Sequence, residues 1–139
     1  MDEKDFRNFT PAQLRPDCPF CYENIKSEII ARHDSVCAIN DKYPVTKDHI
    51  LIIPVKHSED FFSLTTDERR DAEKLLLIMK KRISQKDSSV TGFNIGTNCG
   101  KSAGQTVFHA HIHLIPRRDG DTPEPRGGVR GVIPDKMSY

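Results

Sequence analysis

Histidines alternate with apolar residues in the segment HAHIHLI, residues 109–115. In a β-strand, successive side chains point to opposite faces, so residues two positions apart share a face. The alternation therefore predicts a strand in which His109, His111 and His113 form a row, spaced by roughly 7 Å, while the apolar residues between them face a core. Pro116 is expected to end this strand, because proline cannot donate to the hydrogen-bond ladder of a sheet.

Four other β-prone segments precede the histidines. Residues 28–32 and 35–39 have the pattern of a hairpin. Residues 49–55, HILIIPV, are apolar throughout, which predicts a central strand. A further strand is expected near residues 90–96.

Residues 63–85 predict one long helix. Thr65 can cap its start, and Glu68 can complete a capping box. Apolar side chains then recur at helical spacing and predict one buried stripe, made of Ala72, Leu75, Leu76, Met79 and Ile83. Five strands in antiparallel neighbours and one helix indicate an α+β fold: an antiparallel sheet of about five strands, one long helix and irregular termini.

The composition favours one soluble domain over the full 139 residues, with an irregular C-terminal tail at about 119–139. A net charge of +1 argues against a dedicated nucleic-acid binder. The chain has no apolar run long enough to span a membrane, and its start, MDEKDFRNFT, lacks the features of a secretory signal. We therefore expect a cytoplasmic protein without nucleic-acid or membrane partners, in which structural disulfides between its four cysteines are not expected.

Three histidines in register can serve as a metal site or as a nucleophile with its helpers; a solvated sheet face is the remaining interpretation. A neutral imidazole can attack phosphorus through one nitrogen while an acceptor holds the other N–H. The preceding loop, NCGKSAGQT, fits a phosphate partner, because Gly100 and Gly104 permit close approach of the backbone to an anion.

Cys18 and Cys21 have the spacing with which two thiolates bind one metal ion. A redox pair and two ordinary small residues are the alternatives. A zinc ion would require two further ligands, for which His57 and His109 are the candidates.

The segment GQTVFHAHIHLIPRR resembles the motif of the histidine triad (HIT) family, in which three histidines alternate with apolar residues after Gly-Gln-Ser/Thr. Residues 40–57, NDKYPVTKDHILIIPVKH, and residues 18–21, CPFC, are similar to two further family motifs. The resemblance covers about residues 18–118. It implies a histidine triad-like fold and a nucleotide hydrolase or transferase that acts at an α-phosphate.

The resemblance also implies a role for each matching residue. His111 would be the nucleophile that forms a nucleotidyl-histidine, His113 would bind the phosphate, and His49 would support the triad. Positions that match contacts to the α-phosphate and to the bridging or leaving-group oxygen are Asn98, Gln105 and Thr106. Asn40 or Asp41 would hold the ribose hydroxyls.

Some bacterial-type family members bind a structural zinc, and the resemblance implies the ligand set Cys18, Cys21, His57 and His109. His109 would then anchor the strand. Magnesium can accompany a polyphosphate substrate, although no acidic cluster indicates a dedicated site for it. The chain departs from many family members at Asp48, where they have glycine; this carboxylate either raises the pKa of His49 or points to solvent.

The residues LIPRR after the triad look like the dinucleoside polyphosphate hydrolase branch of the family, which favours diadenosine polyphosphates as substrates. Nucleoside phosphoramidates are the alternative, and a mononucleotide-binding module without turnover is another. The arginines that follow the triad suit contacts with phosphates, but neighbouring acidic residues nearly cancel their charge. These tail arginines are Arg117, Arg118, Arg126 and Arg130. The resemblance further implies a homodimer.

Overall fold

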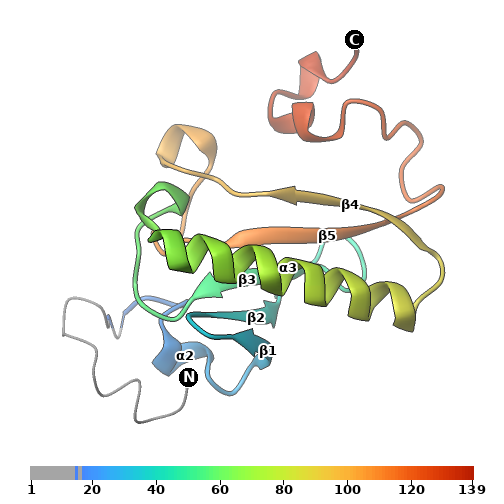
Figure 1. Cartoon of the computed structure of the whole chain (residues 1–139). Helices are drawn as coiled ribbons and strands as arrows, with labels where there is room; N and C mark the ends of the chain where they lie inside the picture. Colours follow the sequence, from blue (N-terminus) through green and yellow to red (C-terminus); the bar gives the residue numbers. More distant parts are fainter. Residues whose placement is uncertain (1–14, 16) are drawn as a thin grey trace.

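The structure is a computed structural model that describes residues 15 and 17–139 (Figure 1). Its helices are α2 (Tyr22–Ile25) and α3 (Thr66–Lys86), and its strands are β1 (Ile29–His33), β2 (Val36–Asn40), β3 (Ile50–Pro54), β4 (Val90–Gly96) and β5 (Ile112–Arg118). Short 3-10 helices lie at η2 (Phe61–Ser63), η3 (Lys101–Ala103), η4 (Gly128–Val132) and η5 (Pro134–Lys136). Within this described part, no helix combines the length and the apolar character needed to cross a membrane.

The five strands form one antiparallel sheet in the order β1-β2-β3-β5-β4. The predicted α+β fold, with one long helix beside a five-stranded antiparallel sheet, is confirmed. The order makes β1 and β4 the two edges and places β5 between β3 and β4. The segment that carries the histidines thus runs into the interior of the sheet.

Helix α3 covers one face of the sheet (Figure 1). Its buried residues Ala72, Leu75, Met79 and Ile83 pack on a cluster that includes Ile50, Ile52 and Leu114. Leu51 of β3 is paired with His113 of β5, and both side chains point to the opposite face. We call that opposite face the histidine face.

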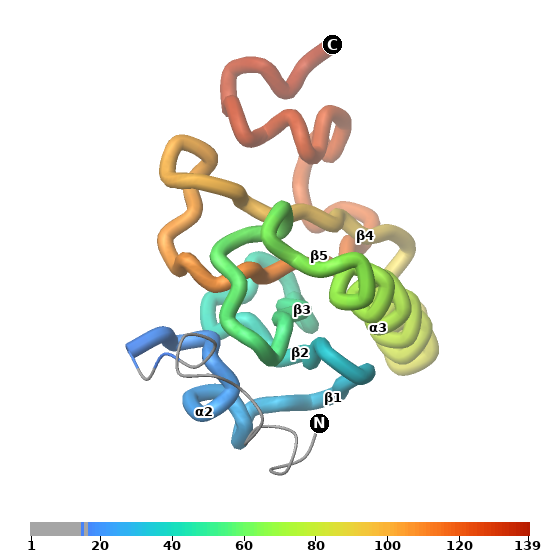
Figure 2. The backbone as a smooth tube through the Cα atoms, turned by 60° about the vertical axis from the view of Figure 1, so that its left-hand side comes forward, coloured from blue at the N-terminus to red at the C-terminus, as the bar shows by residue number. Residues whose placement is uncertain are grey.

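The histidine face is covered unevenly. Near β1, β2 and β3, Ile25 of α2 packs on a second apolar cluster with Cys37, Ile39, Leu51 and Ile53. The C-terminal segment after β5 lies at the other end of the molecule, on the β4 side (Figure 2). The middle of this face, between the two covers, is where the histidines lie.

The predicted strand at residues 109–115 is partly wrong, because β5 begins at Ile112 and continues through Pro116 to Arg118. The two preceding histidines lie outside the ladder: Ala110 N–H donates to the Ser58 carbonyl at 2.7 Å instead. Strand β3 pairs with β5 only as far as Leu114, so Pro116 pairs with a strand on the β4 side alone, while its carbonyl accepts from the Thr46 hydroxyl at 2.7 Å. A proline is tolerated in such a one-sided position.

The sequence predicts an irregular N-terminus. Residues 1–14 and 16 lie outside the described part of the chain, and the remainder contains the short helix α2, which the sequence did not predict. The C-terminal tail contains η4 and η5 but no longer element.

Candidate functional site

The three histidines of the triad segment have different surroundings. His109 is completely buried, whereas His111 and His113 are partly exposed. The rings of His111 and His113 lie 5.4 Å apart between centroids. The ring of His109 instead lies 5.0 Å from that of His57. The row therefore separates into a pair on the histidine face and one buried imidazole.

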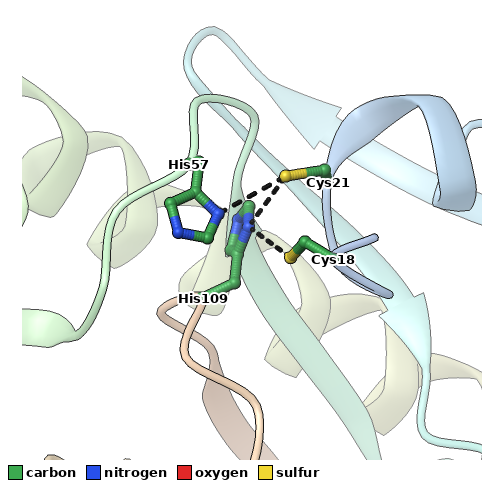
Figure 3. A group of neighbouring side chains, drawn as sticks. All are labelled: Cys18, Cys21, His57 and His109. Atoms are coloured by element: carbon green, nitrogen blue, oxygen red, sulfur yellow. Dashed lines mark hydrogen bonds between the residues drawn. The ribbon is translucent and has the colours of Figure 1, made fainter. Parts of the chain in front are cut away.

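His109 belongs to a group of four side chains that meet at the start of the triad segment, Cys18, Cys21, His57 and His109 (Figure 3). The Nδ1 atom of His109 lies 3.4 Å from the sulfur of Cys18 and 3.6 Å from that of Cys21. The sulfur of Cys21 is also 3.4 Å from Nδ1 of His57. Tetrahedral zinc, with Zn–S of about 2.3 Å and Zn–N of about 2.0 Å, separates sulfur from nitrogen by about 3.5 Å.

Protonation states within this group suit a metal ion. The Pro54 carbonyl lies 2.9 Å from Nε2 of His109 and can only accept, so Nε2 carries the proton and Nδ1 presents its lone pair to the cysteines. Burial lowers the pKa of His109 to about 4, which keeps the ring neutral. Burial raises the pKa of the Cys21 thiol to about 11, so this thiol ionises near neutral pH only beside a cation. The donor set therefore fits a closed four-ligand zinc site.

His111 is held by the backbone of the residue two positions before it. The carbonyl oxygen of His109 lies 2.8 Å from Nδ1 of His111, so this nitrogen is the donor. The proton is thereby fixed on Nδ1, and Nε2 is left with its lone pair. Thr97 steadies the same segment, because its hydroxyl donates to the His111 carbonyl at 2.8 Å. An imidazole in this tautomer can act as a nucleophile or as a base.

His113 and His49 form a second chain of fixed tautomers. The backbone N–H of Val45 donates to Nδ1 of His49 at 3.1 Å, so the His49 proton lies on Nε2. That Nε2 is 2.9 Å from Nδ1 of His113 and donates to it. The His113 proton is therefore on Nε2, which makes His113 a hydrogen-bond donor at its outer nitrogen.

The charges around this chain favour neutral rings. Burial lowers the pKa of His49, and the Asp41 carboxylate opposes part of that effect. Burial also lowers the pKa of His113, with the nearby imidazoles of His111 and His49 acting in the same direction. Asp41 Oδ2 lies 3.4 Å from His49 Nε2 and 3.8 Å from His113 Nδ1.

The predicted substrate-binding residues lie at different depths. Asp41 is half-buried beside the histidines, whereas Asn40 is exposed at the end of β2. Asn40 and Asp41 are the two alternatives for binding the ribose hydroxyls, and of these Asp41 is the one that lies near the pair formed by His111 and His113. Asn98 is half-buried, and Thr106 is exposed. Their contacts with a substrate remain predictions.

Gln105 is buried and already has three hydrogen bonds to the backbone. Its Nε2 donates to the carbonyl oxygens of Glu59 at 2.7 Å and Val107 at 3.1 Å. Its Oε1 accepts from the N–H of Gly100 at 2.8 Å. This amide shapes the glycine-rich loop; its predicted contact with a phosphate remains a prediction.

Two pockets flank the histidine pair. One, of about 190 Å³, lies on the α2 side, and its lining includes Phe20, Ile39, Asp41, Leu51 and Val107. We call it the α2-side pocket. The other, of about 540 Å³, lies on the tail side and is lined by His49, His113, Asn94 and Asn98 together with the tail residues Val129 and Val132. We call it the tail pocket.

The arginines after the triad are paired with acidic side chains. Arg117 reaches both oxygens of Asp121, at 2.8 and 2.7 Å, and this contact holds the pKa of the Asp121 carboxyl well below its usual range. Arg118 donates to Asp87 at 2.9 Å. The cancellation of charge that the sequence indicated is thus present at these two positions.

Asp48 adopts the left-handed region of the backbone, with φ of 70°. Glycine is favoured there because it lacks a Cβ atom. The Asp48 carboxylate turns toward Lys86, 3.1 Å away, and Arg118, 3.9 Å away. Among the causes of the shifted His49 pKa, the carboxylate that acts is Asp41.

Three contributors escaped the sequence analysis. Val45 acts through its backbone N–H, which leaves no trace in residue type. Thr97 lies one residue before the loop that was singled out. Phe20 lies between Cys18 and Cys21, and its ring meets that of His111 edge-on at 4.9 Å between centroids. Its signal in the sequence is an aromatic residue between two cysteines with metal-ligand spacing.

Comparisons with known proteins point to one family. The sequence profile of the HIT domain matches residues 22–120. An uncharacterized HIT-like protein of Methanocaldococcus jannaschii is 34% identical over 128 residues, which cover 86% of this chain and 95% of that protein. The AP-4-A phosphorylase of Mycobacterium tuberculosis is 34% identical over 114 residues, 81% of this chain but only 57% of that enzyme.

Solved structures give the same result. A hypothetical histidine triad nucleotide-binding protein of Sulfolobus tokodaii aligns with a TM-score of 0.67 and 34% identity, over 77% of this chain and 73% of that one. A Zn-bound histidine triad family protein of Mycobacterium smegmatis aligns with a TM-score of 0.61 and 30% identity, over 78% and 80%. The matched profile spans most of the chain, from α2 to the end of β5, and the chain therefore belongs to the HIT domain family.

Proposed function

We propose that this protein is a cytoplasmic nucleotide hydrolase that acts at an α-phosphate through a nucleotidyl-histidine intermediate. The observation that carries the proposal is the hydrogen bond from His111 Nδ1 to the His109 carbonyl. It fixes the proton away from Nε2, so a neutral nucleophilic nitrogen is available without a separate base to remove a proton.

In the first step, His111 Nε2 forms a bond to the α-phosphorus, and the bond from phosphorus to the leaving group breaks. The outer N–H of His113 would donate to a phosphate oxygen and offset the charge that develops there. In the second step, the oxygen of a water molecule bonds to phosphorus, the electron pair of the P–N bond returns to His111 Nε2, and the proton from the water passes to solvent. A polyphosphate leaving group departs as the anion, whereas an amine leaving group takes up one proton from solvent. The products are a nucleoside monophosphate and a free imidazole at His111.

For the substrate we favour diadenosine polyphosphates, supported by the residues LIPRR after the triad and by the M. tuberculosis relative whose name includes AP-4-A. Nucleoside phosphoramidates are the second candidate. The pairing of Arg117 with Asp121 favours them, because it neutralises a cation that lines the tail pocket. A leaving group with little negative charge would suit such a pocket.

Zinc is proposed as a structural ion of the bacterial type, held by Cys18, Cys21, His57 and His109. The support is the match between the sulfur–nitrogen distances and tetrahedral coordination, together with the Zn-bound relative of M. smegmatis. Such an ion would join the segment before α2 to the end of β3 and to the start of the triad segment. With four protein ligands it leaves no open position for substrate.

A homodimer is also proposed, formed along the β4 edge. Leu77 of α3 and Ile95 of β4 are large apolar side chains that are 57% and 51% exposed. They line a groove of about 400 Å³ between helix and strand, next to the unpaired side of β4. Exposed strand edges and apolar patches favour pairing with another chain.

The decisive experiment compares the wild type with His111→Asn. We expect the wild type to convert diadenosine tetraphosphate or an adenosine phosphoramidate to AMP and to show an acid-labile nucleotidyl adduct by mass spectrometry. The variant should bind AMP but lose turnover by at least about 10³-fold, with no adduct.

His33→Asn, a change of the same type on β1, serves as the control and should remain active. Persistent turnover in His111→Asn would exclude the mechanism, and AMP binding without turnover of either substrate by the wild type would identify a binding module.

A further inference from the structure

The loop that carries the two metal-site cysteines also contacts the nucleophile. Phe20 lies between Cys18 and Cys21, and its ring meets the ring of His111 at 4.9 Å with an angle of 67° between the planes. The same ring lies 6.5 Å from His109 at an angle of 89°. Phe20 is thus the aromatic side chain that links the metal group to the histidine face.

Phe20 is at the same time part of the wall of the α2-side pocket. Pro19, Ile39, Leu51 and Val107 contribute apolar surface to that pocket. Asp41, which also lines it, contributes a carboxylate. Flat apolar walls with one acceptor suit a base and its sugar, because a base packs on apolar and aromatic surfaces and a sugar hydroxyl donates to a carboxylate.

The position of Phe20 depends on how its loop is held. The backbone hydrogen bonds of the loop are local, from Cys18 N–H to the Arg15 carbonyl and from Cys21 N–H to the Cys18 carbonyl. Phe20 itself packs on the apolar cluster that includes Ile39 and Leu51. Polar contacts that tie the loop to the end of β3 and to the triad segment run through the two sulfurs, to His57 and His109 (Figure 3). A metal bound there would replace these weak contacts with coordinate bonds and fix the loop.

We propose that Phe20 is a positioning residue through which the Cys₂His₂ metal group sets the affinity for nucleotide, by holding one aromatic wall against both the His111 ring and the α2-side pocket. This inference rests on the proposed function. It adds that the metal group acts on ligand binding as well as on the stability of the fold. The consequence is reciprocal: nucleotide binding must strengthen metal binding by the same factor.

The first test keeps the metal in place. AMP and GMP are titrated into wild type, Phe20→Leu and Phe20→Tyr by calorimetry, and zinc per chain is measured for each protein. We expect Phe20→Leu to retain its zinc and bind the tighter nucleotide about tenfold more weakly, and Phe20→Tyr to restore binding to within about threefold. Phe108→Leu is the matched control: Phe108 precedes His109 but lines a different pocket, next to His57, and its loss should leave nucleotide affinity unchanged.

The second test measures zinc affinity by competition with a chelator, with and without nucleotide at ten times the Kd of each protein. The wild type should bind zinc several-fold more tightly in the presence of nucleotide. The zinc affinity of Phe20→Leu should change by less than twofold when nucleotide is added. An equal gain in both proteins means that nucleotide merely stabilises the folded state, which overturns the role of Phe20. Unchanged nucleotide affinity in zinc-loaded Phe20→Leu overturns it as well. If the wild type binds neither nucleotide, the proposed function itself fails.

Discussion

Three imidazoles of the candidate site are each held in one tautomer by a backbone group that can only donate or only accept. The Pro54 carbonyl fixes His109, the His109 carbonyl fixes His111, and the Val45 N–H fixes His49. Two of these three partners come from outside the triad segment. A motif specifies that histidines are present, but their protonation depends on backbone atoms that only the folded chain brings near.

The buried histidines predict a loss of stability in mild acid. The pKa of His109 falls from an ordinary 6.5 to about 4, and those of His49 and His113 are also lowered. Between these pH values the unfolded chain binds protons that the folded chain does not, so acid favours unfolding. His109 alone should remove about 3 kcal/mol across this window.

Urea unfolding in steps from pH 7 to pH 4, at fixed total zinc, measures this effect. A metal ion on Nδ1 opposes protonation of His109 further, so it acts in the same direction. Hydrogen bonds to Ser89 and Arg117 lower the pKa values of Asp87 and Asp121. The stability that these two carboxylates contribute is therefore lost only at pH values below the usual pKa of a carboxyl group. A free energy of unfolding that stays constant between pH 6.5 and pH 5 would contradict the prediction.

Asp48 allows a test of backbone strain, because its φ is positive. Asp48→Gly and Asp48→Ala both lose the contacts with Lys86 and Arg118, so the difference between them isolates the backbone. Glycine normally destabilises relative to alanine, but here we expect the glycine variant to be more stable by about 1 kcal/mol. The measurement is the midpoint of urea unfolding for each variant, compared where the two transitions have equal slopes. A more stable alanine variant would show that the strain is absent.

Elements that depend on local signals were predicted well. Helix α3 begins after the predicted cap Thr65, and four of the five residues of its predicted stripe are buried, with Leu76 partly so. The start of β5 was misplaced, because the residues before it bind the Ser58 carbonyl and the Thr97 hydroxyl, which belong to distant segments. Hydrophobic alternation gives the side-chain faces, but the extent of pairing depends on the neighbouring strands.

The cap of α3 should contribute measurably to stability without affecting the site. Thr65 Oγ1 accepts from Glu68 N–H at 3.0 Å, and Glu68 Oε1 accepts from Thr65 N–H at 2.9 Å. Thr65→Ala should lower the free energy of unfolding by about 1 kcal/mol, whereas Thr65→Ser should retain most of it. Thr66→Ala, one position later, is the control and should be nearly neutral. Since α3 covers the face opposite the histidines, AMP affinity should be the same in all three; a parallel loss of affinity would contradict this separation.

The site as a whole draws on residues far apart in the chain. Cys18 and His109 are 91 positions apart, and His49 and His113 are 64 apart. Their grouping could be anticipated from the family motifs, because those motifs carry the geometry of a known fold. The cancellation of charge in the tail could be anticipated from its composition. The particular carboxylate that each arginine meets, and the contact of Phe20 with His111, could not, since they depend on the packing of this particular chain.

The β4 edge predicts how two molecules associate. Leu77 and Ile95 present an apolar groove beside a strand with one open side, and removing that surface from water is the main source of free energy for association. A charge at Leu77 would have to be buried without a partner, so Leu77→Glu should convert a dimer into a monomer. Sedimentation velocity at micromolar concentration measures the change. Ile30→Glu places the same charge on β1, at the opposite edge of the sheet, and should leave the dimer intact. A wild type that sediments as a monomer would show that the protein does not associate. A dimer that is lost only with Ile30→Glu would show that it associates through another surface.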